Sequence, residues 1–238
     1  FRRVLFRSGG ESVSNGDTLT FNGSSNPTVA GNISYAGNIV TSSQTGSSMT
    51  FTGDIQAESF KVAHYYGRIH MAGNELAVNK LWVGAGGGYD NSLYGALDLD
   101  SGNVTTAGQV RLAELGHGVL NVNQGSSLTV SGSNDTHSTS ASFLLAHWAY
   151  SGELNLRGGS LTALSTSMRL SWDGTGTFNA SSGTADLLGM SFWASGNGSF
   201  RGSFLLGGAT SGDARVNIGS SGITDVAGAA VIKLGEGT

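Results

Sequence analysis

The 238-residue chain contains no cysteine, a single proline and few charged residues, which make up 12% of it against about 25% in typical globular chains. The absence of cysteine excludes a disulfide framework, cysteine-based zinc sites and thiol catalysis. No apolar run reaches the roughly 18–20 residues of a membrane-spanning helix. The formal net charge is −4 and no basic run lies beyond the first eight residues, which argues against nucleic acid as a partner.

Glycine is abundant instead: the chain has 39 glycines, about double the usual share of ~7%. Because charged residues are scarce, Ser, Thr, Asn and Gly must supply most of the polar surface. These residues are poor helix formers and favour turns. The composition therefore predicts strands and turns rather than a helical protein.

The first eight residues, FRRVLFRS, differ from the rest of the chain. They hold three of the twelve Lys and Arg residues and stop abruptly at Gly9. All eight match the translation of a common sequencing-adapter stretch. We therefore interpret residues 1–8 as an artefact that is not native and omit them from the fold prediction. A basic N-terminal arm or the end of a signal sequence is the alternative.

A short phrase recurs from residue 95 onward, with alternating apolar and polar residues between glycines. Its clear copies are GALDLDSG (95–102), GVLNVNQG (118–125), GELNLRGG (152–159) and GTFNASSG (176–183), and its weaker copies are GSFRGS (198–203) and SGITDV (221–226). The anchoring apolar residues are Leu97, Leu120, Leu154, Phe178, Phe200 and Ile223, and their successive sequence spacings are 23, 34, 24, 22 and 23. A period near 23 suits one coil of a β-helix.

Each repeat holds two further strand phrases. The second strand reads Val104-Thr105, Leu128-Thr129, Leu161-Thr162 and Ala185-Asp186, and the third covers 110–112, 143–145, 168–170, 190–192 and 214–216. Strand alternation places Leu120 and Val122 inside the coil and Asn121 outside. The sequence thus predicts an all-β fold: a right-handed single-stranded parallel β-helix (solenoid) with about 23 residues and three strands per coil.

The prediction divides the chain into two parts beyond the artefact. Residues 9–94 form less regular N-terminal β-helix coils, in which strand-like phrases such as TLTFNG (18–23) alternate with Gly and Asn turns. Residues 95–238 form the regular coils. No linker separates a further domain. The chain stops at GEGT while the repeat still runs, so we expect truncation at the C-terminus as well as a missing native N-terminus.

Several stretches resemble the glycine-rich repeats of autotransporter-associated β-strand proteins. They are GDTLTFNGSSNPTVAGNISYAGNIV (16–40), LWVGAGGGYDNSLYGALDLDSGNVTTAG (81–108), GELNLRGGSLTA (152–163) and ARVNIGSSGITDVAGAAVIKLG (214–235). The likeness covers nearly all of residues 9–238 through degenerate motifs. It implies export, a β-helical passenger, a secreted or cell-surface location outside the outer membrane, and an anchor elsewhere in a longer bacterial protein.

Two motifs suggest chemistry, and each has a simpler interpretation. Gly116-His117-Gly118 is similar to a motif of β-helical polygalacturonases, but the aspartate cluster that supplies acid and base is missing, which favours a turn. Asp98 and Asp100 share one strand face and would suit calcium binding or acid–base chemistry. Alternatively, Asp98 occupies the slot that Asn holds in neighbouring coils.

Metal and sugar sites have equally weak signals. AGGGYD (85–90) partly matches a calcium β-roll repeat but occurs once, and His64 and His70 lack a third ligand. Aromatic residues would form a sugar-stacking strip, or else fill and cap coils: Trp82, Trp148, Trp172, Trp193, Tyr65, Tyr66, Tyr89 and Tyr94. We predict no catalytic residue, no metal site and no cofactor.

Three arginines form the candidate ligand-facing row. Arg111, Arg169 and Arg215 each lie between two apolar residues of a third strand, at sequence offsets of 14, 15 and 15 from the anchor of their coil. Equal offsets in a stacked solenoid predict one shared face. A solvated surface is the favoured interpretation, and a docking strip for an acidic glycan is the alternative.

These patterns predict a non-catalytic structural or adhesive passenger segment of a secreted or surface-displayed bacterial protein, acting as a monomer. Its expected partners are host or environmental glycans or surface proteins. A β-helical carbohydrate-active enzyme or glycan-binding module is the alternative, which requires outward Asp, Lys or Arg clustered in a groove.

Overall fold

The structure is a computed structural model whose described residues form strands, turns and bends, and no helix. It describes residues 18–23, 26–43, 47–63, 67–85, 94–113, 116–131, 141–146, 151–163, 167–171, 175–187, 191–194, 202–206, 214–218, 223–225 and 230–234. Residues 1–8, which we interpret as an artefact, lie outside these ranges.

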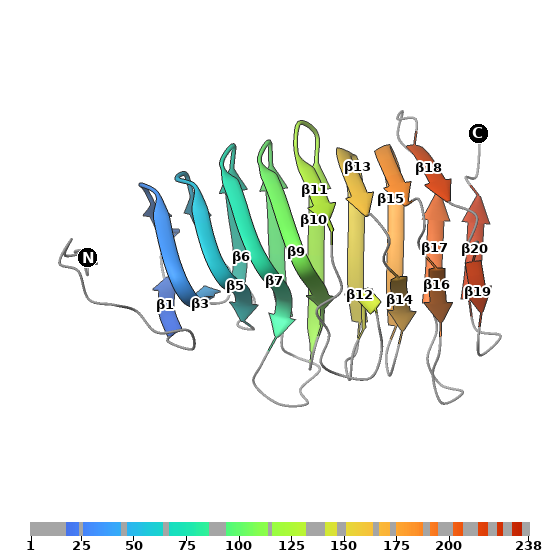
Figure 1. The fold of residues 1–238 in the computed structure, drawn as a ribbon, viewed down its shortest axis with the longest axis horizontal. Helices are drawn as coiled ribbons and strands as arrows, with labels where there is room; N and C mark the ends of the chain where they lie inside the picture. The colour runs from blue at the N-terminus through green and yellow to red at the C-terminus, as the bar shows by residue number, and fades with distance from the viewer. Residues whose placement is uncertain are drawn as a thin grey trace.

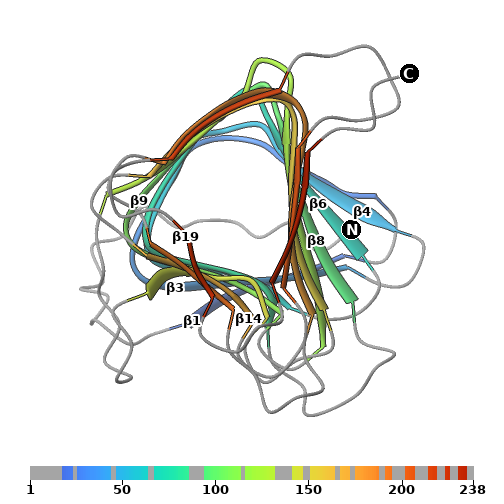
Figure 2. The same ribbon diagram turned by 90° about the vertical axis from the view of Figure 1, so that its right-hand side faces the viewer.

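The chain winds as a parallel β-solenoid, in which the strands of successive coils pair along three faces around a central interior (Figure 1 and Figure 2). Neighbouring coils are offset by sequence separations such as 23 from Leu97 to Leu120 and 24 from Leu154 to Phe178. The prediction of an all-β parallel β-helix with three strands per coil is therefore confirmed.

Face one contains the repeated phrase of the sequence. Its strands are β2 (Thr28–Val29), β4 (Ser48–Phe51), β6 (Gly67–Ala72), β8 (Tyr94–Asp100), β10 (His117–Asn123), the first parts of β13 (Ser151–Ala163) and β15 (Thr175–Leu187), β17 (Gly202–Leu206) and β20 (Ala230–Leu234).

Faces two and three share several long strands that bend from one face to the next. Face two consists of the first parts of β3 (Ile33–Ser43), β5 (Ile55–Ala63), β7 (Glu75–Ala85) and β9 (Asn103–Leu112), then β11 (Ser127–Val130), the second parts of β13 and β15, and β18 (Ala214–Ile218). Face three consists of β1 (Thr18–Gly23), the second parts of β3, β5, β7 and β9, then β12 (Ala141–Leu144), β14 (Ser167–Ser171), β16 (Ser191–Ala194) and β19 (Ile223–Asp225).

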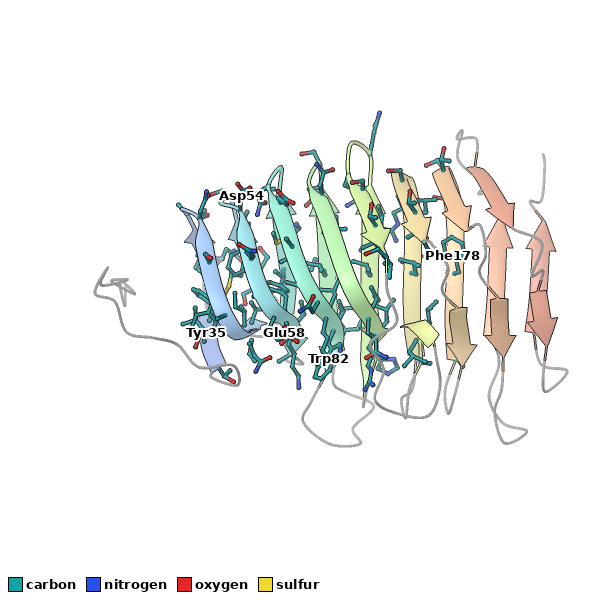
Figure 3. All side chains as sticks on the ribbon, viewed as in Figure 1. Tyr35, Asp54, Glu58, Trp82 and Phe178 are labelled. Atoms are coloured by element: carbon teal, nitrogen blue, oxygen red, sulfur yellow. The ribbon has the colours of Figure 1, made fainter. Side chains whose placement is uncertain are left out.

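The interior is a continuous apolar column that runs along the solenoid axis. Leu97, Leu120, Leu154 and Phe178 occupy equivalent positions of face one, and all four are fully buried. Phe178 is labelled in Figure 3. Since alternate residues of a strand point to opposite sides, these apolar residues fill the coil while their neighbours face outward. The predicted inside–outside assignment is correct for these four coils.

The assignment of the last coils from sequence was wrong. Phe178 pairs with Phe204 rather than with Phe200, and Ile223 pairs with Phe192 on face three rather than continuing face one. The phrase 214–216 also pairs with β15 on face two, although the sequence spacing assigned it to the third strand. The reason is that apolar alternation marks all three faces alike, so spacing alone cannot identify a face where coil length changes.

A column of glycines explains why each clear copy of the phrase begins with Gly. Gly95, Gly118, Gly152, Gly176 and Gly202 are in register at the start of face one. Here the strand passes very close to the end of face three. A Cβ on Gly118 would overlap the backbone of Val83 and Ala113, and a Cβ on Gly152 would overlap the Leu145 carbonyl oxygen. Only glycine therefore fits this corner without a backbone shift.

Candidate functional site

A polar ladder runs along the outside of face one and is the first candidate site. His70, Asp98, Asn121, Asn155 and Asn179 occupy equivalent positions of successive strands. Asn155 Nδ2 donates to Asn121 Oδ1 at 3.0 Å, and Asn121 Nδ2 donates to Asp98 Oδ1 at 2.5 Å. Although these side chains point away from the core, Asp98, Asn121 and Asn155 are buried. The ladder is therefore a structural hydrogen-bond network as well as a surface feature.

One end of the ladder is a charged cluster. Arg68 Nη1 donates to Asp98 Oδ1 at 2.7 Å and to Asp98 Oδ2 at 2.5 Å. The side chain of Asp98 is only 5% exposed, whereas that of Arg68 is 44% exposed. His70 Nδ1 lies 2.7 Å from Asp100 Oδ2 and 3.7 Å from Asp98 Oδ2. Asn123 Nδ2 donates to Asp100 Oδ1 at 2.7 Å.

Electrostatic coupling follows this geometry. The hydrogen bonds to Asp98 raise the pKa of Arg68, although burial acts to lower it. Burial raises the pKa of the Tyr94 phenol, while the nearby Arg68 charge lowers it. Both carboxylates of the predicted acid–base or calcium pair, Asp98 and Asp100, are thus engaged by neighbouring side chains. This arrangement suits a structural role, in which the carboxylates tie coils together.

Replacing Arg68 with Ala tests that role. We expect the free energy of unfolding to fall by about 1–2 kcal/mol, because the buried Asp98 carboxylate keeps the Asn121 amide but loses its charged partner. The loss is smaller than for a fully buried pair, since solvent already screens the exposed Arg68. Urea unfolding measures it. Arg157→Ala, an exposed arginine on the same face, is the matched control and should change stability by at most about 0.5 kcal/mol. Equal losses in both variants would contradict the structural role.

The predicted arginine row is only partly assembled. Arg111 and Arg169 both pair with Leu144, so they share one row of face three. Arg215 pairs with Thr184 and lies on face two, so the three-arginine row was wrong at this residue. The cause is the misassigned register of the last coils. Whether Arg111 and Arg169 contact a ligand stays a prediction.

Arg111 belongs to a cluster on face three that the sequence analysis missed. Arg111 is 5% exposed, its Nε donates to Gln109 Oε1 at 2.6 Å, and its guanidinium lies 5.5 Å from the ring centre of Trp82. Lys61 Nζ lies 5.4 Å from the same ring centre. The signal that could have revealed this cluster is the apolar–X–apolar phrase around Lys61, Trp82 and Arg111, because it places all three outward in one row.

Of the other residues that the sequence suggested, His117 is described by the structure, and several others lie outside the described ranges. His117 Nδ1 lies 2.6 Å from Ser151 Oγ of the next coil. His64, the AGGGYD stretch beyond Ala85, Trp148 and Trp172 lie outside the described residues. In the part of the chain that the structure describes, no three or more His, Asp or Glu side chains gather in a metal-binding arrangement.

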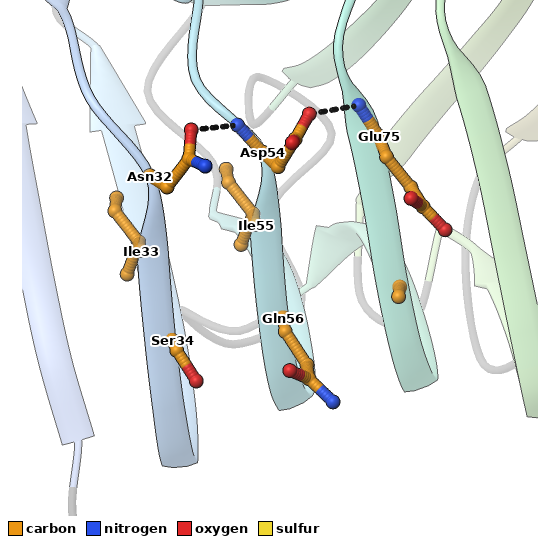
Figure 4. A pocket seen from close by; sticks show the side chains of 8 residues that line it. Asn32, Ile33, Ser34, Asp54, Ile55, Gln56 and Glu75 are labelled. Atoms are coloured by element: carbon orange, nitrogen blue, oxygen red, sulfur yellow. Dashed lines mark hydrogen bonds between the residues drawn. The ribbon is translucent and has the colours of Figure 1, made fainter.

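A shallow groove of about 340 Å³ follows the start of face two (Figure 4). Asn32 Oδ1 accepts a hydrogen bond from Asp54 N at 3.0 Å, and Asp54 Oδ1 accepts one from Glu75 N at 2.9 Å. These side chains therefore connect the turns of successive coils. The groove therefore lies over the stacked turns at the start of face two.

The fold and these ladders define the class: an all-β parallel solenoid whose outer polar residues link one coil to the next. No family model, curated protein or solved structure matches this chain. Within the described ranges, no helix is long and apolar enough to cross a membrane.

Proposed function

We propose that the chain is a non-catalytic structural or adhesive segment of a secreted or surface-displayed bacterial protein. The observation that carries the proposal is the use of outward polar side chains as links between coils. The ladder from Asp98 through Asn121 to Asn155 joins three successive strands of face one. A scaffold that stands away from a cell needs this stiffness along its axis. Stacking supplies it, because hydrogen bonds join each coil to the next along the axis.

The resemblance to autotransporter-associated repeats supports the same proposal. It suggests a passenger that is exported and held at the cell surface by an anchor elsewhere in a longer protein. The low content of charged residues and the absence of cysteine suit a chain stabilised by stacking alone. Glycans or surface proteins of a host or of the environment are the proposed partners.

The proposal predicts a folded rod on the cell surface that leaves polysaccharides intact. The chain is fused between an export signal and a surface anchor, with an epitope at its free end. We expect intact cells to bind an antibody against the epitope, and the segment to resist added protease. The Leu154→Asp variant, which disrupts the core, is the control and should be degraded.

A second measurement separates this proposal from the enzyme alternative. Purified protein is incubated with acidic and neutral polysaccharides, and newly formed reducing ends are counted. We expect no increase over buffer. Release of reducing ends that disappears in Asp98→Asn would overturn the proposal in favour of a carbohydrate-active enzyme.

A further inference from the structure

The two ends of the solenoid have strand edges, and they lie at opposite ends of its long axis (Figure 1). In the part of the chain that the structure describes, β1 pairs with β3 alone, β2 with β4 alone, and the first part of β3 with β5 alone. At the other end, β18, β19 and β20 each pair with one earlier strand. Each of these six segments therefore has an edge along which the described residues provide no partner for the backbone N–H and C=O groups.

The apolar interior is also open at the N-terminal end. Leu19 and Val29 pack against the core but are only partly buried. Their partners in the next coil, Ile39 and Phe51, are at most 1% exposed, because a described coil covers them on both sides. The strands β1, β2 and the first part of β3 contain no charged residue, and the single proline of the chain, Pro27, precedes β2. The N-terminal end thus combines an apolar surface with strands that lack the charges that commonly protect an edge.

The two ends also match each other in shape and in register. Viewed along the axis, strands from both ends of the chain follow the same three-sided outline (Figure 2). Register rows whose middle members form the apolar core run from the first coil to the last strands, and they have an apolar residue at both ends: Val29 to Leu234, Leu19 to Ile223, and Ile33 to Val216. A C-terminal end placed on the N-terminal end of another copy therefore continues all of these rows with apolar residues.

The charges at the two ends are compatible with such a contact. On face one, Lys233 belongs to the same register row as Thr28. On face two, Arg215 precedes Val216 as Asn32 precedes Ile33, so the arginine comes opposite a neutral amide. Like charges directly opposite each other destabilise paired strands, and neither position brings two charges together.

We propose that the C-terminal end of one copy of this chain stacks on the N-terminal end of another, with parallel strand pairing on all three faces. The contact repeats the pairing that already joins coil to coil within the chain. Because the two surfaces in contact differ, the association is heterologous and does not close after two copies. The product is a filament along the solenoid axis rather than the monomer that the sequence suggested. The proposed display function does not require this partner, so the two proposals can fail separately.

Sedimentation velocity and negative-stain electron microscopy of the purified chain test the stacking. We expect the mean mass to rise with protein concentration without an upper limit, and the micrographs to show unbranched filaments one solenoid wide. A monomer at every concentration up to about 1 mM overturns the proposal. A mass that stops at the dimer also overturns it. Filaments that form only after removal of residues 1–17 assign the N-terminal edge to that segment of the chain instead of to a second copy.

Charge variants test the predicted register. Thr28→Lys places a positive charge opposite Lys233 of the next copy and should raise the concentration of half-association by up to about fivefold. Thr28→Glu places a negative charge there and should lower that concentration by a similar factor. Combining Thr28→Lys with Lys233→Glu should restore association. Thr50→Lys makes the same change one strand inside the stack and is the matched control, with an expected effect of less than about twofold.

A stronger block uses the exposed end of the interior. Val29→Lys places a charge in a row that the second copy must cover, and it should abolish filaments. Val29 is only partly buried, so the variant should remain folded, and its circular dichroism spectrum checks this. Equal effects of Thr28→Lys and Thr28→Glu, or filaments that persist in Val29→Lys, would show that the two ends do not meet. A displayed, folded rod that stays monomeric leaves the display function standing and removes only this inference.

Discussion

Replacing Leu154 with Asp is expected to unfold the solenoid at room temperature or bring it close to unfolding. Leu154 is fully buried and packs in the interior column between Leu120 and Phe178. The substitution removes the apolar contacts and buries a carboxyl group with no partner, which together cost about 5 kcal/mol. Because domains are stable by only about 5–15 kcal/mol, urea unfolding followed by circular dichroism should show a large fall in the midpoint.

Two substitutions on the same strand calibrate this result. Glu153→Gln changes an exposed residue and should alter stability by at most about 0.5 kcal/mol. Asn155→Asp should cost about 1–3 kcal/mol, because Asn155 is 3% exposed and its amide donates to Asn121 Oδ1. If Asn155 were solvent-exposed, as its outward direction suggests from sequence, the expected loss of stability would be smaller. Similar losses in all three variants would mean that the inside–outside assignment of β13 is wrong.

Gly152→Ala is expected to destabilise the protein nearly as much, by about 3 kcal/mol or more, although it adds one methyl group. The added Cβ would overlap the Leu145 carbonyl oxygen, which is backbone and cannot rotate away. The strand must then separate from the end of face three, which strains the coil on both sides. Thermal unfolding of the purified variant measures the loss.

The matched control is Gly31→Ala, which tests backbone conformation without a steric overlap. Gly31 has a φ of +94° and no atom within 4 Å of the position of an added Cβ. Its substitution should cost only about 1–2 kcal/mol, from backbone strain in the left-handed region. If Gly152→Ala costs no more than Gly31→Ala, the close approach at the glycine column is not a constraint on the fold.

The repeated phrase was sufficient to predict four coils correctly. GALDLDSG, GVLNVNQG, GELNLRGG and GTFNASSG stack in the predicted register, even across the longer coil between Leu120 and Leu154. The prediction succeeded there because the phrase begins with a glycine that the corner before face one requires. Its apolar alternation then assigns the inside and the outside of the strand. It failed in the last coils, where GSFRGS lacked the full phrase and its Phe200 was mistaken for Phe204.

The candidate site was less predictable than the fold. Asp98 and Asp100 are evident as a carboxylate pair in the sequence, but the binding of Asp98 by Arg68 from the preceding coil is not. Arg111 is likewise evident from its place between two apolar residues, but its approach to the Trp82 ring, which Lys61 also contacts, is not. A local apolar–X–apolar phrase can show that a side chain points outward, but which residues of different coils become neighbours depends on the pairing between coils.

Alternating polarity and glycine-bounded repeats thus determined the all-β class, the parallel stacking and the interior residues, because strand periodicity assigns inside and outside within a few residues. The coil pairing decided the register, the burial of Asp98 and Asn121, and the row of Lys61, Trp82 and Arg111. The sequence separation between paired positions is 21 for Asn38 and Ser59 but 34 for Asn121 and Asn155. Loop-closure entropy changes by only about 0.6 kcal/mol for each doubling of loop length, so coils of different lengths are tolerated and the packing of the stack sets the register.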